Sequence, residues 1–192
     1  MVAQQQNTLT DLSDRTDEQL VAEAARESSG GAAFNCLLER HRQKVWRICF
    51  RLMGNEHDAN DAAQEVFVQL FLSRANFAGR SKYSTWLHGV AVRTCLTLRR
   101  SRSRRLKRVA VASEPPERPT ITTEATSKAL ELDLMQMLET LNEDDRAMLI
   151  LKHAEGHSYE ELAEMFDLSV SACKMRLSRA REKLKERFPD QL

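Results

Sequence analysis

The sequence predicts an all-α protein with two helical domains joined by a flexible linker. Apolar residues recur at three- and four-residue intervals through most of the chain, which is typical of amphipathic helices. Glycine and proline are scarce, at 6 and 4 of 192 residues, and three of the four prolines fall together at Pro115, Pro116 and Pro119. With 42% hydrophobic and 30% charged residues, the composition supports packed cores and excludes a disordered or collagen-like chain.

No apolar run approaches the roughly 18 residues that a membrane span requires. Residues 1–15 are polar and contain no apolar signal-peptide core, so we expect a disordered N-terminal tail there. The four cysteines are far apart and none forms a C-x-x-C pair. Because this pattern favours reduced thiols, we expect a soluble cytoplasmic protein.

The first domain, residues 16–108, begins with a short helix. Thr16 and Gln19 have the spacing of a capping box, in which each side chain bonds the other residue's backbone N–H. Gly30 and Gly31 are expected to end this helix.

Longer helices follow in the same domain. Apolar positions within 34–52 share one helical face, and Asn55 can cap a further helix with an apolar stripe in 62–71. After a loop at 73–84, another helix begins near Trp86 and continues into a block of arginines.

A stretch rich in Ser, Thr, Glu and Pro separates this domain from the next. It has no helical periodicity, so residues 109–128 are predicted to be a semi-extended linker. The second domain, residues 129–188, then opens with a helix over 130–141. Asn142 can cap the following helix, which Gly156 terminates.

The end of the second domain has the pattern of a helix-turn-helix. Ser158 and Glu161 form a second capping box, a turn follows at 167–169, and Ser169 can cap a final basic helix. Such a helix presents donors to the major groove of DNA. Its alternative is an ordinary helical hairpin whose basic residues only solvate it. The residues off its apolar seam that we expect to contact DNA are Ser171, Lys174, Met175, Arg176, Ser178, Arg179 and Arg181.

The net charge of +1 conceals segregation of the charges. Residues 93–108 hold eight basic and no acidic residues, and residues 174–187 hold seven bases against two acids. Between the two blocks, residues 109–145 hold nine acids against two bases. Two separate basic blocks suggest two contacts with a polyanion, although charge runs are also found on merely solvated faces.

Three stretches, taken in order, resemble bacterial RNA polymerase sigma factors of the extracytoplasmic-function (ECF) group. Residues 58–67, DANDAAQEVF, are similar to region 2.2 of that family, and residues 83–91 contain its T-W-L pattern before region 2.4. Residues 156–163, GHSYEELA, together with KMRLSRAR at 174–181, resemble region 4.2. The resemblance implies a region 2 domain and a region 4 helix-turn-helix domain in an alternative transcription initiation factor.

The resemblance also implies partners and their contact residues. Core RNA polymerase is expected to bind through its β′ clamp helices and its β flap. The clamp helices are expected to contact the acidic and amide face of region 2.2, which consists of Asp58, Asp61, Gln64 and Glu65. Promoter DNA is the second expected partner and an anti-sigma factor the third. Contacts to the minus-ten element are expected from Phe77, Arg80, Lys82, Tyr83, Arg93, Arg99, Arg100, Arg102, Arg104 and Arg105. The final helix is expected to recognise the minus-thirty-five element.

Several positions depart from the family pattern. Arg93 replaces a usual Asn and Thr97 a frequent Asp, which bears on minus-ten specificity. Ser171-Ala172-Cys173 replaces the common G-T-V, and Met175 the usual Ser. These two changes bear on the minus-thirty-five sequence that is recognised.

No catalytic motif is present, so we expect no enzymatic activity, no metal and no cofactor. His153 and His157 lie four apart, but Gly156 breaks the helix that would align them. One alternative is a stand-alone helix-turn-helix regulator that binds operators without polymerase. Another is a module that sequesters a second factor. Neither accounts for two basic blocks and an acidic helix face on one chain.

Overall fold

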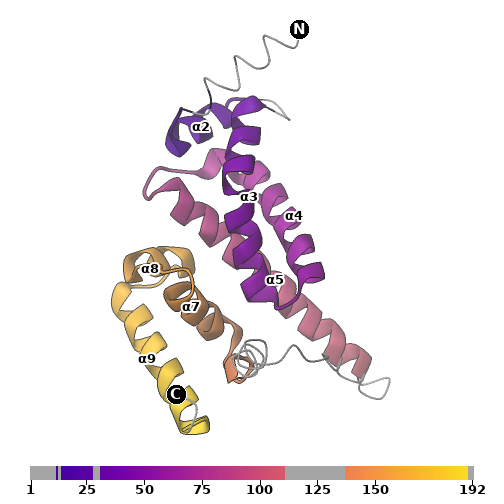
Figure 1. The fold of residues 1–192 in the computed structure, drawn as a ribbon, viewed down its shortest axis with the longest axis vertical. Coiled ribbons are helices and arrows are strands. Elements are labelled where there is room, and N and C mark those ends of the chain that lie inside the picture. The colour runs from indigo at the N-terminus through magenta and orange to yellow at the C-terminus, as the bar shows by residue number, and fades with distance from the viewer. Residues whose placement is uncertain (1–11, 13, 28–30, 111–136, 190–192) are drawn as a thin grey trace, which may run out of the picture. The chain divides into compact units, whose positions relative to one another are not determined.

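Every regular element in the described part of the chain is helical (Figure 1). The computed structural model describes residues 12, 14–27, 31–110 and 137–189. Most of the predicted N-terminal tail, the predicted linker beyond residue 110 and the start of the helix predicted at 130–141 therefore lie outside the described residues. The all-α fold class predicted from the sequence is confirmed.

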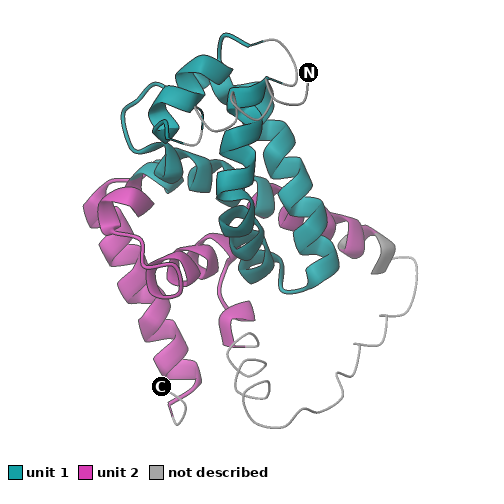
Figure 2. Ribbon diagram, turned by 45° about the horizontal axis from the view of Figure 1, so that its top comes forward, with its two compact units in different colours: residues 1–95, 164–167 teal, residues 96–163, 168–192 magenta. Residues whose placement is uncertain are grey.

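The chain divides into two compact units (Figure 2). One consists of residues 1–95 with 164–167, and the other of residues 96–163 with 168–192. The division falls inside the long helix α5 (Tyr83–Ala110). The domain limits drawn from the sequence remain predictions.

The core of the first unit lies between long helices. Its elements are α2 (Asp17–Ala24), α3 (Ala32–Met53), α4 (Glu56–Ser73), the 3-10 turn η1 (Arg74–Asn76) and the first half of α5. Helices α3 and α4 run side by side (Figure 1). Val45 and Ile48 of α3, Val66 of α4 and Leu87 and Ala91 of α5 are all buried, as the apolar stripes predict. Burial of aliphatic side chains such as these is the main driving force for packing the helices.

The local signals in the sequence position the ends of these helices. The capping box at the start of α2 is present: Gln19 N–H donates to Thr16 Oγ1 at 3.3 Å, and Thr16 N–H donates to Gln19 Oε1 at 2.9 Å. Gly54 ends α3 with φ +83°, a left-handed conformation that glycine adopts without a Cβ clash. Asn55 caps α4.

The first helix is shorter than the sequence predicts. Helix α2 ends at Ala24, before the two glycines, and Gly31 is instead the N-cap residue of α3; Gly30 is not among the described residues. Arg74 contacts the chain where α2 ends. Its guanidinium donates to the Ala24 and Glu27 carbonyls at 3.0 and 3.2 Å and to the Phe71 carbonyl at 2.6 Å. One side chain thus joins the C-terminal ends of α2 and α4.

The helices of the second unit pack around a smaller core. Helix α7 (Glu143–His153) and helix α9 (Val170–Arg187) contact each other, and the short helix α8 (Tyr159–Phe166) lies between them in the sequence (Figure 1). Met148, Leu151, Leu162, Cys173 and Leu177 are each at most 2% exposed. Predicted N-caps at Asn142 and Ser169 are present, and Gly156 has φ +75°.

Candidate nucleic-acid interface

Helices α8 and α9 form the helix-turn-helix that the sequence predicts. The second capping box opens α8, because Glu161 N–H donates to Ser158 Oγ at 3.1 Å and Ser158 N–H donates to Glu161 Oε2 at 2.9 Å. The turn contains Asp167 with φ +53°, a left-handed conformation that Asp tolerates better than most residues. Ala172 N–H then donates to Ser169 Oγ at 3.2 Å, which caps α9.

The outer face of α9 presents most of the residues predicted to contact DNA. The buried seam of the helix is Cys173, Leu177, Ala180 and Leu184. Off this seam, the exposed predicted residues are Ser171, Lys174, Met175, Ser178, Arg179 and Arg181. Met175 is 54% exposed, which is unusual for an apolar side chain and leaves its thioether open to a partner.

Arg176 has different surroundings from its predicted companions. Its guanidinium pairs with Asp145 and lies 3.3 Å from Asp144, both in the first turn of α7. Although burial lowers the pKa of Arg176, its hydrogen bond to Asp145 and the charges of both acids raise it overall. In this arrangement Arg176 joins α9 to α7, whereas the exposed cations face outward.

The loop after η1 brings together aromatic residues near the start of α5. The ring of Phe77 lies 5.5 Å from that of Tyr83 and 5.6 Å from that of Trp86, between centroids. Tyr83 is only 2% exposed, and its ring also meets His41 edge-on at 5.7 Å. Burial and the negative charge of Asp17 raise the pKa of Tyr83. The sequence placed Tyr83 among the DNA contacts, but the structure buries it in the core, where its ring meets that of half-buried Phe77.

Cationic side chains lie near this aromatic cluster in the sequence, in the loop and farther along α5. Arg80 and Lys82 are exposed in the loop. On α5, Arg93, Arg100, Arg102, Arg104 and Arg105 are exposed and Arg99 is half-buried. Arg104 Nε donates to the Arg100 carbonyl of its own helix at 3.3 Å. Thr97, which replaces an Asp common in the pattern, is also exposed on α5.

The residues of the acidic and amide face of α4 differ in exposure and in their contacts, with Asp58 and Glu65 half-buried. Asp58 accepts a hydrogen bond from Asn55 Nδ2 at 2.6 Å, so its carboxylate takes part in the cap of α4. Glu65 accepts from Gln69 Nε2 at 2.7 Å. Asp61 and Gln64 are both exposed.

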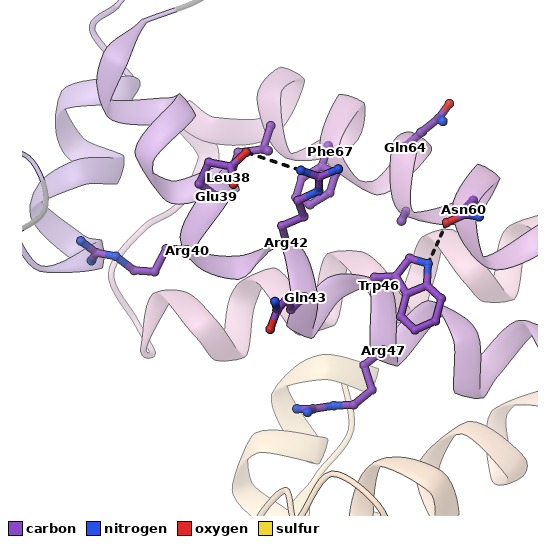
Figure 3. Close-up of a pocket in the computed structure, with 11 residues that line it drawn as sticks. Leu38, Glu39, Arg40, Arg42, Gln43, Trp46, Arg47, Asn60, Gln64 and Phe67 are labelled. Carbon is purple, nitrogen blue, oxygen red and sulfur yellow. Dashed lines mark hydrogen bonds and ion pairs between the residues drawn. The ribbon is translucent and has the colours of Figure 1, made fainter. Parts of the chain in front are cut away.

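An open groove lies between α3 and α4 beside this acidic face (Figure 3). From α3 it is lined by Arg42, Trp46 and Arg47, and from α4 by Asn60 and Gln64. The indole N–H of Trp46 donates to Asn60 Oδ1 at 2.7 Å. The Trp46 ring also stacks on the Phe50 ring, with the centroids 5.2 Å apart and the ring planes at 14° to each other.

Sequence reasoning missed the α3 side of this groove. Trp46 and Phe50 lie four residues apart and off the apolar stripe of α3, which contains Val45, Ile48 and Cys49. Two aromatic residues one helical turn apart on the polar face could have indicated a binding surface.

The described residues show no metal site and no membrane-spanning helix. In this part of the chain, no three His, Cys, Asp or Glu residues are grouped as metal ligands. No helix within the described ranges is long and apolar enough to cross a membrane. The four cysteines are free thiols. Cys49 and Cys95 are buried in the core with their sulfurs 3.7 Å apart.

A basic helix-turn-helix and a second basic helix, in a chain whose described elements are all helical, define a DNA-binding protein. Comparison with known proteins gives its family. Residues 37–105 match the family model for sigma-70 region 2, and residues 131–184 match the model for sigma-70 region 4. The chain is 30% identical over 183 residues to the ECF RNA polymerase sigma-E factor of Haemophilus influenzae, covering 90% of this chain and 95% of that protein.

Other relatives agree. The RNA polymerase sigma-H factor of Pseudomonas aeruginosa is 30% identical over 186 residues, covering 89% of this chain and 93% of that protein. A solved structure of CnrH in complex with the cytosolic domain of CnrY is similar in fold, with a TM-score of 0.61 and 27% identity. The similarity covers 90% of this chain and 97% of that chain. The Bartonella quintana sigma factor RpoE, solved with the anti-sigma factor NepR, gives a TM-score of 0.62 at 24% identity, covering 80% of this chain and 94% of that chain.

The chain belongs to the ECF group of bacterial RNA polymerase sigma factors. It is therefore an alternative transcription initiation factor that acts with core RNA polymerase at promoter DNA, and it is not an enzyme. The family assignment favours this function over that of a stand-alone helix-turn-helix regulator.

Proposed function

We propose that the polymerase-binding face of this factor consists of the acidic side of α4 together with the groove between α3 and α4. The observation that carries the proposal is the juxtaposition of Trp46 and Asn60 with exposed Gln64 in that groove (Figure 3). Asp58, Asp61 and Glu65 supply negative charge along the neighbouring surface. A partner helix rich in Arg and Lys, such as the β′ clamp helices, fits the carboxylates and amides of α4, with Trp46 as an aromatic anchor. Arg42 and Arg47 on the α3 side of the groove would face acidic or neutral residues of that partner.

The minus-ten element is proposed to meet the loop after η1 and the basic part of α5. Phe77 offers a half-buried ring on which an unpaired base can stack, and edge contacts with Tyr83 and Trp86 hold that ring in place. Arg80, Lys82, Arg93 and the cluster Arg99, Arg100, Arg102, Arg104 and Arg105 provide charge for the DNA backbone. Stacking and charge together offset the few kcal/mol that unstacking a base costs.

The minus-thirty-five element is proposed to meet α9. Ser171, Lys174, Met175, Ser178, Arg179 and Arg181 lie on its exposed face, where a recognition helix contacts base edges and phosphates. Ser178 Oγ also lies 3.2 Å from Glu182 Oε1. Arg176 contributes indirectly in this proposal, by holding α9 on α7.

We further propose a cytoplasmic location, contact with the polymerase β flap, and control by an anti-sigma factor. Two structurally similar proteins were solved with a bound partner, which in one of them is an anti-sigma factor. Their partners support a comparable regulator here.

Co-elution with bacterial core RNA polymerase on size-exclusion chromatography tests the polymerase face. The wild-type chain is expected to co-elute, whereas Asp61→Arg combined with Glu65→Arg abolishes co-elution, because it places like charges against a basic partner. Trp46→Ala is expected to lower the affinity for core polymerase about tenfold or more, and so to reduce the co-eluting fraction, because an aromatic anchor of the interface is lost.

Glu186→Arg on α9 is the matched control, since it reverses an exposed charge far along the chain from α4. It is expected to co-elute like the wild type. Unchanged co-elution of the Asp61/Glu65 variant would contradict the proposed face. Binding of duplex DNA by the isolated chain, with no co-elution at all, would support the stand-alone regulator.

A further inference from the structure

Tyr159, in the first turn of α8, lies against two ammonium groups. Lys152 Nζ of α7 is 4.4 Å from the centroid of the Tyr159 ring, and Lys174 Nζ of α9 is 5.4 Å from it. Both distances are within the range in which the negative face of an aromatic ring attracts a cation. The same ring therefore lies near one cation from each of the helices that precede and follow α8 in the sequence.

The two lysines differ in how firmly they are held. Lys152 is half-buried, and its ammonium also donates to the His157 carbonyl at 2.9 Å in the turn before α8. Lys152 is thus fixed between a backbone oxygen and the ring. Lys174 is exposed on the face of α9 assigned above to the minus-thirty-five element.

A lysine side chain has a flexible four-carbon stem, and fixing its conformation on DNA costs up to about 2 kcal/mol of rotamer entropy. A ring that already attracts the ammonium reduces this cost before DNA arrives. We propose that Tyr159 is a positioning residue for promoter recognition, whose ring holds the Lys174 ammonium on the DNA-facing surface of α9. This inference rests on the proposed role of Lys174.

A competing explanation for the placement of Lys174 is the carboxylate of Glu160. The pKa of Glu160 is lowered first by a backbone hydrogen bond and by Ser158, and the ammoniums of Lys174 and Lys152 lower it further. Both lysines therefore also lie near a negative charge. Glu160 is fully exposed, so water screens its attraction to them more than it screens contact with the ring.

The first test uses the full chain without DNA. After reductive methylation of the lysines with ¹³C-formaldehyde, the methyl resonance of Lys174, assigned with Lys174→Met, is expected to be shifted upfield by the ring current of Tyr159. Tyr159→Leu removes this shift, whereas Tyr159→Phe and Glu160→Gln keep it. A Lys174 resonance at the position of the other exposed lysines would overturn the inference, as would loss of the shift in Glu160→Gln.

The second test measures binding of the holoenzyme to a promoter that the wild-type holoenzyme selects from a randomised DNA library. Tyr159→Leu is expected to weaken binding about two- to fivefold, the range for an exposed cation–π contact. The loss disappears when the minus-thirty-five element is scrambled, and Tyr159→Phe restores wild-type binding. In a Lys174→Met background, Tyr159→Leu has no further effect.

Two outcomes of the second test are distinguishable from each other. Unchanged binding by Lys174→Met would contradict the proposed role of Lys174, and this inference would fall with it. A loss in Lys174→Met alone, with none in Tyr159→Leu, would overturn the positioning role while leaving the DNA face of α9 intact. Equal thermal unfolding midpoints of the Leu and Phe variants show that the comparison concerns the ring and not stability.

Discussion

Arg176 and Arg179 lie three positions apart on α9, yet their environments assign them different tasks. Arg176 pairs with Asp144 and Asp145 of α7, and about one third of its side chain is exposed. Arg179 is exposed on the face of α9 that carries Met175. Hydrogen bonds between charged groups that are partly buried stabilise a fold more than surface ion pairs do. The side chain's partners thus decide the role of each arginine.

Replacing each of these arginines by methionine separates the two roles. Arg176→Met is expected to lower the free energy of unfolding by about 1 kcal/mol, since Asp145 loses its cation while Asp144 keeps its ion pair with Arg100. Arg179→Met is expected to change stability by less than about 0.5 kcal/mol, but to weaken minus-thirty-five recognition. Denaturant unfolding and promoter binding measure the two effects. A larger stability loss in Arg179→Met would reverse the assignment.

At the scale of the element, the caps of the helix-turn-helix fix where its recognition helix begins. Ser169 accepts the Ala172 N–H, and the left-handed Asp167 precedes it in the turn. The capping box of Ser158 and Glu161 sets the start of α8 in the same way. Because α9 would enter the groove with its first turns, its starting residue determines which side chains face the bases.

Ser169→Ala is expected to destabilise the protein by about 1 kcal/mol, because the start of α9 loses the side-chain acceptor for the Ala172 N–H. Ser169→Asp keeps an acceptor and adds a negative charge at the positive end of the helix, so it is expected to retain wild-type stability. Thermal unfolding followed by circular dichroism measures both variants. Equal midpoints for the Ala and Asp variants would contradict the capping role.

At the scale of the whole molecule, two basic surfaces are carried on one chain with a small net charge. The bases of 93–108 belong to α5 and those of 174–187 to α9. When one surface is bound, the connection between them raises the effective concentration of the other at the DNA. If both surfaces bind DNA as proposed, binding energy is shared between two contacts, and we expect full affinity to need both promoter elements.

This arrangement predicts a steep dependence of promoter binding on salt. The logarithm of the holoenzyme binding constant is expected to fall linearly with the logarithm of salt concentration, by about 0.9 per duplex phosphate neutralised and about 0.7 per single-strand phosphate. Replacing Arg100, Arg102 and Arg104 by Gln is expected to reduce the slope relative to the wild type. Fluorescence anisotropy over a salt series measures it. An unchanged slope would show that this block does not contact phosphates.

The sequence alone predicted the helices, most of their caps and the helix-turn-helix, because these depend on local chemistry. Thr16, Asn55, Asn142 and Ser169 each act within three residues of their partners, and the apolar stripes follow a fixed helical period. The ordered motifs also indicated the ECF sigma-factor family, which the comparisons established. The sequence overestimated the length of α2, which ends at Ala24, where the carbonyl accepts a hydrogen bond from Arg74, 50 residues away.

Only the tertiary structure decided what individual side chains are available to do. The sequence pattern suited both Tyr83 and Arg176 to DNA contact. Packing buried Tyr83, and Arg176 forms ion pairs with residues 31 and 32 positions away. The groove between α3 and α4 and the two ammoniums near Tyr159 likewise bring together residues from different helices. Local sequence determines helices because their hydrogen bonds are local. Which polar groups remain exposed depends on contacts between residues distant in the chain, and these form only when the helices pack.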